Sequence, residues 1–296
     1  MSGNNQIKIG ISFNPSSCGY GRYGNDKFLK LKQHGYDAVD YCLAHTDIEL
    51  YSLNENELKE KLNQEKAFAK TAGIKISQIH GPWRYPPQDS TEDERKERLE
   101  KMKRAVVISS FLECKYLVIH PIMPCGTDDL QTQKEKETWD LNLAFFKELV
   151  AFAKQYDVTI CLENMPMIQF SLAKPEQILK FVKEFNDDHM KICLDTGHVS
   201  VFPELSIGDE VRRLGDYIKV FHIHDNNGDR DSHLYPTKGI IDWADFSSAV
   251  NEIGSDAVLS LETGPSENLE DDAFEKENIE FSNSFRELIE KIIKNI

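Results

Sequence analysis

The chain has 296 residues, and its 35 Lys and Arg residues against 50 Asp and Glu residues give a formal charge of -15 at pH 7. This charge disfavours partners such as nucleic acid and anionic membranes, because both would repel the protein at long range. The N-terminus MSGNNQIKIG lacks the order of a secretory signal, and no apolar stretch approaches the ~20 residues that span a bilayer. We therefore expect a cytoplasmic protein whose partner is a small molecule.

Short apolar, β-branched runs alternate with longer amphipathic segments along the chain. We expect eight strands, within residues 7–13, 36–43, 74–81, 116–121, 158–165, 191–197, 219–225 and 257–264. Segments rich in Lys, Glu and Leu predict helices between them, for example at 53–73, 90–113 and 134–157. Asn54 and Ser90 are the expected N-caps of the first two, since their side chains can accept backbone N–H bonds.

Strands separated by helices are joined by right-handed crossovers into a parallel sheet, and eight such units favour a (β/α)8 TIM barrel. The alternative is an open doubly wound sheet, which would carry a GxGxxG turn after its first strand. The segment that follows the first expected strand is NPSSCGYGRYG, and its glycines do not have this spacing. We therefore predict a single barrel domain over residues 1–296.

The six cysteines are scattered without the CxxC spacing of redox or metal motifs. They are Cys18, Cys42, Cys114, Cys125, Cys161 and Cys193. Several stand within apolar runs, where cysteine behaves as a small core residue. We expect reduced thiols.

Carboxylates and imidazoles gather at the carboxyl ends of the predicted strands, which meet at one mouth of a barrel. They are His80, His120, Glu163, Asp195 with His198, His222 with His224, and Glu262, and Asp231 and His233 follow the seventh strand. Any one of them alone would more often be a hydrogen-bonded structural group. Together in a partly dry mouth they would repel one another or lie unsatisfied, unless a divalent cation held them. Mixed carboxylate and imidazole ligands favour Zn²⁺, Mn²⁺, Co²⁺ or iron, while Mg²⁺ prefers oxygen ligands.

Six ordered motifs carry a resemblance to a known family: ISQIHGPW, LVIHP, CLENMP, CLDTGHVS, FHIHDNNGDRDSHLYPTKGIIDW and LSLETG. They resemble the xylose isomerase-like TIM-barrel superfamily, which contains sugar phosphate isomerases and epimerases and also endonuclease IV. In the isomerase and epimerase branch, the resemblance implies one divalent metal ion held by Glu163, Asp195, His222 and Glu262. His224 is the alternative ligand to His222. We prefer His222 because Asp225 follows His222 three residues later, in an HxxD pattern like those of the superfamily.

Similarity to endonuclease IV implies a wider set of ligands and up to three zinc ions. The further residues are His80, His120, His198, Asp231 and His233. However, the loop after His80 lacks an identifiable DNA-reading stretch. The loops expected around the mouth after Glu163, Asp195 and Glu262 contain no Lys or Arg to contact phosphates, and the last two of them add acids.

The resulting prediction is a divalent-metal-dependent sugar or sugar-phosphate isomerase or epimerase. The resemblance implies that Glu163 and Glu262 move a proton at a carbon next to a carbonyl, while His198 contacts a substrate hydroxyl. Trp83 and Tyr85 are candidate contacts for the sugar, and Arg84 and Lys238 for a phosphate; all four are equally consistent with packing or surface roles. The alternatives are an endonuclease IV-like zinc phosphodiesterase and a metal-dependent binding protein without turnover. The identity of the sugar and a homo-oligomeric state are left open.

Overall fold

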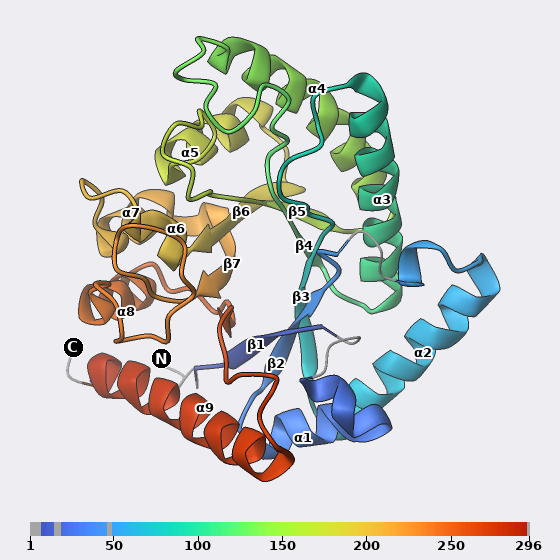
Figure 1. Cartoon of the computed structure of the whole chain (residues 1–296), viewed down its shortest axis with the longest axis vertical. Helices are drawn as coiled ribbons and strands as arrows, with labels where there is room; N and C mark the ends of the chain where they lie inside the picture. Colours follow the sequence, from blue (N-terminus) through green and yellow to red (C-terminus); the bar gives the residue numbers. More distant parts are fainter. Residues whose placement is uncertain (1–6, 15–18, 46–48, 295–296) are drawn as a thin grey trace.

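The computed structural model describes residues 7–14, 19–45 and 49–294, and within them eight parallel strands close into a barrel (Figure 1). The strands are β1 (Ile9–Phe13), β2 (Ala38–Cys42), β3 (Lys75–His80), β4 (Tyr116–Ile119), β5 (Thr159–Glu163), β6 (Met190–Asp195), β7 (Ile218–Ile223) and β8 (Leu259–Leu261). Each strand pairs with the next, and β8 pairs with β1. The predicted (β/α)8 barrel is confirmed, and each observed strand lies within one residue of the expected range.

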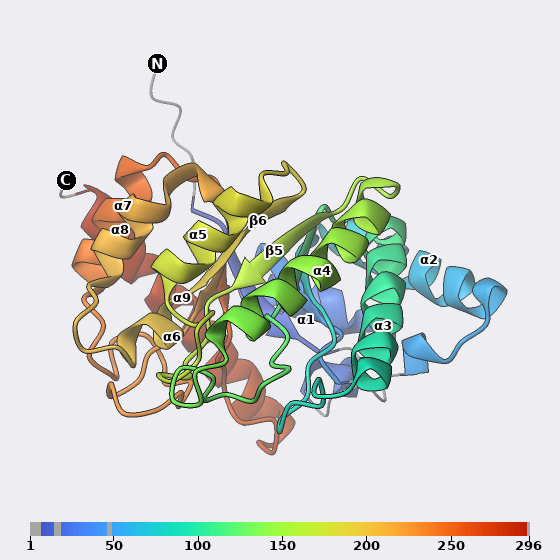
Figure 2. The ribbon, with the colours of Figure 1, turned by 90° about the horizontal axis from the view of Figure 1, so that it is seen from above.

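Helices surround the barrel on its outside (Figure 1). They are α1 (Lys27–Gln33), α2 (Glu55–Ala72), α3 (Glu92–Phe111), α4 (Glu135–Lys154), α5 (Pro175–Phe185), α6 (Thr196–Ser200), α7 (Ile207–Leu214), α8 (Trp243–Glu252) and α9 (Asp271–Lys294). Figure 2 shows α3 and α4 side by side along one flank. Among the described residues, no helix combines the length and the apolar character needed to cross a membrane.

Of the two expected N-caps, one is confirmed and one is wrong. The side chain of Asn54 caps α2 by accepting hydrogen bonds from two backbone N–H groups of the first turn. Helix α3 is capped by Thr91 and not by Ser90. The reason is the position of Glu94, three residues after Thr91, because its carboxylate accepts the Thr91 N–H at 2.8 Å and completes a capping box.

Side chains alternate between the two faces of each strand, and this alternation sorts them into two apolar layers. The larger layer lies between the strands and the surrounding helices. The smaller one lies inside the barrel and contains Val118 on β4, Cys161 on β5, Cys193 on β6 and Val220 on β7. Two positions farther along the same strands stand His120, Glu163, Asp195 and His222. The period of two therefore carries these four side chains to the mouth.

The thiol prediction agrees with the structure where it can be compared. Cys42, Cys114, Cys125, Cys161 and Cys193 are free, and three of them are buried. Cys18 lies outside the described residues.

A buried ion pair connects α3 to the loops beside the mouth. Arg98 pairs with Asp89 through Nη1 and donates a hydrogen bond from Nη2 to the carbonyl oxygen of His120 at 3.1 Å. We expect Arg98→Met to lower the free energy of unfolding by about 3–5 kcal/mol, because Asp89 would remain buried without its partner. Urea denaturation followed by circular dichroism measures this loss.

Arg84→Met is the matched control for this prediction. Arg84 pairs with Glu97 at 3.1 Å near the surface, where an ion pair contributes at most about 1 kcal/mol. Equal losses in the two variants would show that burial of the Asp89 pair has no special effect on stability.

Candidate metal centre

Glu163 lies at the middle of the mouth, fully buried, with imidazoles on both of its oxygens. Oε1 is 3.0 Å from Nδ1 of His222 and 3.5 Å from Nδ1 of His198. Oε2 is 3.0 Å from Nε2 of His120 and 3.8 Å from Nε2 of His80. One carboxylate from β5 therefore connects histidines that come from β3, from the residue after β4, from α6 and from β7.

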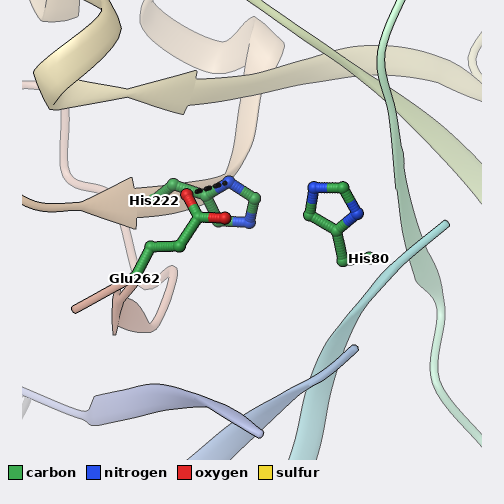
Figure 3. A group of neighbouring side chains, drawn as sticks. All are labelled: His80, His222 and Glu262. Carbon is green, nitrogen blue, oxygen red and sulfur yellow. Dashed lines mark ion pairs between the residues drawn. The ribbon is translucent and has the colours of Figure 1, made fainter. Parts of the chain in front are cut away.

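Three of the four principal predicted ligands share one contact point. Nδ1 of His222 is within 3.0 Å of Glu163 and 3.3 Å of Oε2 of Glu262. Figure 3 shows Glu262 and His80 directed toward His222 from β8 and β3, and the rings of His80 and His222 are stacked. The fourth ligand, Asp195, is the strand partner of His222 in register, but its Oδ2 faces Nε2 of His224 at 3.0 Å.

A second group adjoins the first around Asp231, in the loop after β7. Its Oδ2 is 3.3 Å from Nε2 of His198 and 3.2 Å from Nε2 of His233. Its Oδ1 is 3.5 Å from Nε2 of His224, the same nitrogen that faces Asp195. The structure thus brings all ten predicted site residues into two neighbouring groups.

The sequence Asp-Thr-Gly-His at the end of β6 has a local explanation in this arrangement. Asp195 caps the short helix α6 by accepting the backbone N–H of His198 at 2.6 Å. Thr196 exchanges hydrogen bonds with the backbone of His224 through its hydroxyl group. A Cβ at Gly197 would lie 1.9 Å from Cε1 of His224, so only glycine fits where the helix crosses this imidazole.

The two candidate catalytic carboxylates have pKa shifts in opposite directions. Burial opposes the charge of Glu163, but His222 and His120 outweigh it and hold the pKa of this carboxyl well below its usual range. Burial raises the pKa of Glu262, and the charges of Glu163 and Asp195 add to this rise while His222 acts against it. Two carboxyl groups with separated pKa values are the arrangement that acid–base exchange requires.

The histidines also differ from one another. Burial lowers the pKa of His120 to about 4, although Glu163 acts in the opposite sense. Burial acts against the charged form of His198 too, but Asp195 and Asp231 outweigh it and raise its pKa to about 10.

Several buried atoms of the mouth make no hydrogen bond of good geometry among the described residues, although Glu163 Oε2 lies 3.0 Å from His120 Nε2 and Asp195 Oδ2 lies 3.0 Å from His224 Nε2. They are His120 Nδ1, Glu163 Oε2, Asp195 Oδ2, His224 Nε2 and Asp231 Oδ1. Buried polar atoms without partners are costly, and a cation coordinated by them removes that cost. Nitrogen and carboxylate donors at this spacing fit a divalent cation.

The proposed substrate contacts lie at different places around the mouth. Trp83 is partly buried with its ring centroid 4.4 Å from that of His120. Arg84 is paired with Glu97, Tyr85 is 70% exposed, and Lys238 is exposed in the loop after β7. A cavity of about 220 Å³ also reaches Glu262 from the side of β1.

Asp40 is a buried acid of the mouth that the sequence patterns did not single out. It lies on β2, is 1% exposed, and places Oδ2 2.8 Å from Nε2 of His222. The sequence did contain a signal, because Asp40 is an acid inside an apolar strand. Its side chain falls on the same face of that strand as those of Ala38 and Cys42. An acid at such a position must find a buried partner.

Comparisons with known proteins agree with the fold and the motifs. The family described as xylose isomerase-like TIM barrel matches residues 28–284. The uncharacterized protein MJ1311 of Methanocaldococcus jannaschii is 30% identical over 263 residues, which cover 86% of this chain and 83% of that protein. A D-psicose 3-epimerase of Enterocloster bolteae is 25% identical over 247 residues, covering 79% and 74% of the two chains.

One solved structure and one shorter sequence match are also similar to this chain. The crystal structure of a D-tagatose 3-epimerase-like protein superposes with a TM-score of 0.76 at 23% identity, covering 98% of this chain and 99% of the other. This likeness shows the fold. A probable endonuclease 4 of Metamycoplasma arthritidis is 29% identical over 136 residues, 42% of this chain and 46% of that protein.

Proposed function

Because the chain belongs to the xylose isomerase-like TIM-barrel family, we propose that it is a divalent-metal-dependent sugar or sugar-phosphate isomerase or epimerase. The observation that carries the proposal is the contact of Glu163 and Glu262 with the same nitrogen of His222, at 3.0 and 3.3 Å. Two carboxylates with opposite pKa shifts thus lie beside the proposed position of the cation, which supports a role in proton transfer. The D-psicose 3-epimerase relative supports a sugar as the substrate class.

In this proposal Glu163, Asp195, His222 and Glu262 hold the ion, which is Mn²⁺, Zn²⁺, Co²⁺ or Mg²⁺. The oxygens of Glu163 and Asp195 that accept no hydrogen bond of good geometry support this set. When bound, the cation supplies polarisation of the substrate carbonyl, which makes the neighbouring C–H more acidic.

The side chains of the site would carry out the proton transfer. One of Glu163 and Glu262 removes the proton from carbon, and the other returns one. Return of the proton to the opposite face of the same carbon gives epimerisation, and return of the proton to the neighbouring carbon gives isomerisation. The side chain of Glu262 is 21% exposed, so it can reach a bound substrate, whereas Glu163 acts from the floor of the mouth. His198 and Trp83 would orient the sugar and exclude water.

A panel of ketoses and sugar phosphates tests the proposal, with each candidate metal added to chelator-treated protein. We expect epimerisation or isomerisation of at least one member, lost with EDTA and restored by metal. Solvent deuterium incorporated at the reacting carbon would establish proton transfer. A protein that binds metal and a sugar but turns over no member of the panel would instead be the binding protein without catalysis.

An endonuclease IV-like zinc hydrolase is the second candidate. The contacts of Glu163 with His80 and His120, together with the group around Asp231, favour it, as does the shorter endonuclease 4 match. The net charge of -15 opposes binding of duplex DNA. With the zinc-loaded protein of the same preparation, we expect no nicking of an abasic duplex at physiological salt and no mobility shift at micromolar protein. Efficient nicking, with three zinc ions per chain by elemental analysis, would replace the isomerase proposal.

A further inference from the structure

We propose that Asp40 is a positioning residue that fixes the tautomer of His222 and thereby makes Nδ1 the metal-binding atom of this imidazole. The inference deepens the proposed function and rests on it, because it concerns how the chain prepares one ligand of the proposed ion. Asp40 comes from β2 and His222 from β7, so the contact joins strands that are not neighbours in the barrel.

The neighbours of Asp40 fix the direction of its hydrogen bonds. Nε2 of Gln78 lies 3.2 Å from Oδ2 of Asp40 and 3.3 Å from the carbonyl oxygen of Phe221. A carbonyl oxygen only accepts hydrogen bonds, so the side-chain amide must turn its NH₂ group toward both oxygens. Oδ2 of Asp40 is consequently an acceptor, held in place by Gln78 from β3.

His222 shares this Asp40 oxygen with Gln78. Its Nε2 is 2.8 Å from the same Asp40 oxygen, and a carboxylate acceptor requires a proton on that nitrogen. Nδ1 points at Glu163 and Glu262, and a cation bound between them would take the place of the proton that these carboxylates otherwise attract to this nitrogen. With Nε2 protonated against Asp40, the neutral imidazole then presents its lone pair to the cation through Nδ1. A carboxylate on the far nitrogen of a ligating histidine fixes the ring and raises its basicity.

Three other histidines of the mouth are oriented the opposite way. Nδ1 of His80, His198 and His233 contacts the carbonyl oxygens of Gly81, Asn164 and Glu262 at 2.9, 2.7 and 2.7 Å. Each of these imidazoles donates through Nδ1 and offers Nε2 to the mouth. His222 differs from these three because its Nε2 contacts the carboxylate of Asp40 and not a backbone carbonyl.

The test compares metal affinity in Asp40→Ala, Asp40→Asn and the wild-type full-length chain, by titration with Mn²⁺ and Co²⁺. We expect Asp40→Ala to weaken binding about 10- to 100-fold, the usual effect of removing the partner of a ligand. Asp40→Asn keeps an oxygen that accepts from Nε2, so it should recover much of the loss. Asp129→Asn is the control, because Asp129 is equally buried but bonds to Ser171 in loops outside the two groups.

A spectroscopic measurement on the wild type keeps the inference testable even if Asp40→Ala fails to fold. In zinc-loaded protein with ¹⁵N-labelled histidine, the His222 signals should show a proton on Nε2 and zinc on Nδ1. Zinc on Nε2, or equal affinity in wild type and Asp40→Ala, would overturn the role of Asp40. A wild-type protein that binds none of these ions would instead sink the proposed function, and the inference with it.

Discussion

Glu262→Gln is expected to lower kcat about a thousandfold or more while leaving the fold unchanged. Glutamine has nearly the same shape, but it carries neither the ligand charge nor the exchangeable proton of the carboxyl group. General acid–base groups contribute about 10²- to 10⁴-fold, and the loss of a metal ligand adds to this. Steady-state kinetics on the best substrate of the panel, with metal at saturation, measures the change.

Glu267→Gln is the matched control, since Glu267 lies in the same loop and lines the same cavity but is exposed. It should keep kcat within about twofold, as a surface substitution away from the chemistry does. Thermal melts of both variants would verify the fold. A Glu262→Gln enzyme with near-native kcat would remove this residue from the mechanism.

His222→Ala is expected to weaken binding of the tightest divalent ion at least about a hundredfold, since losing a ligand exceeds the loss of an outer partner. His224→Ala should have a smaller effect, because its Nε2 faces Asp195 and Asp231 and not the two candidate catalytic carboxylates. Titration calorimetry of the two variants, side by side with Co²⁺ or Mn²⁺, measures the difference.

The two alanine variants control for each other, since both remove a fully buried imidazole from the end of β7. Comparable melting temperatures would confirm that both are folded. The reverse order of affinities would place the principal ligand two residues farther along the chain, at the group around Asp231.

The fold and the gathering of the candidate site residues at one mouth were predictable because both follow from short-range regularities. Runs of apolar residues locate the strands, and the period of two puts Glu163 and Asp195 on the same face as Cys161 and Cys193. Since parallel strands end at one mouth, the polar residues at those ends had to meet.

Other features depended on distances that periodicity does not contain. His222 and His224 have the same parity on one strand, so only the three-dimensional structure separates their partners. Asp40 was missed because its partner is 182 residues away on a strand that is not a neighbour. The one-residue error at Ser90 arose because Glu94 decides between two adjacent hydroxyl residues, and both can cap a helix.

The apolar layer beneath the mouth bears on which metals the protein selects. Cys161 and Cys193 lie inside the barrel two residues below Glu163 and Asp195, and burial raises the pKa of both thiols. A thiol that keeps its proton is a poor ligand, because metals bind the thiolate. Cys193 also lies with Glu163 and His222 in one possible ligand group, so an ion that bound its sulfur would first have to displace the thiol proton.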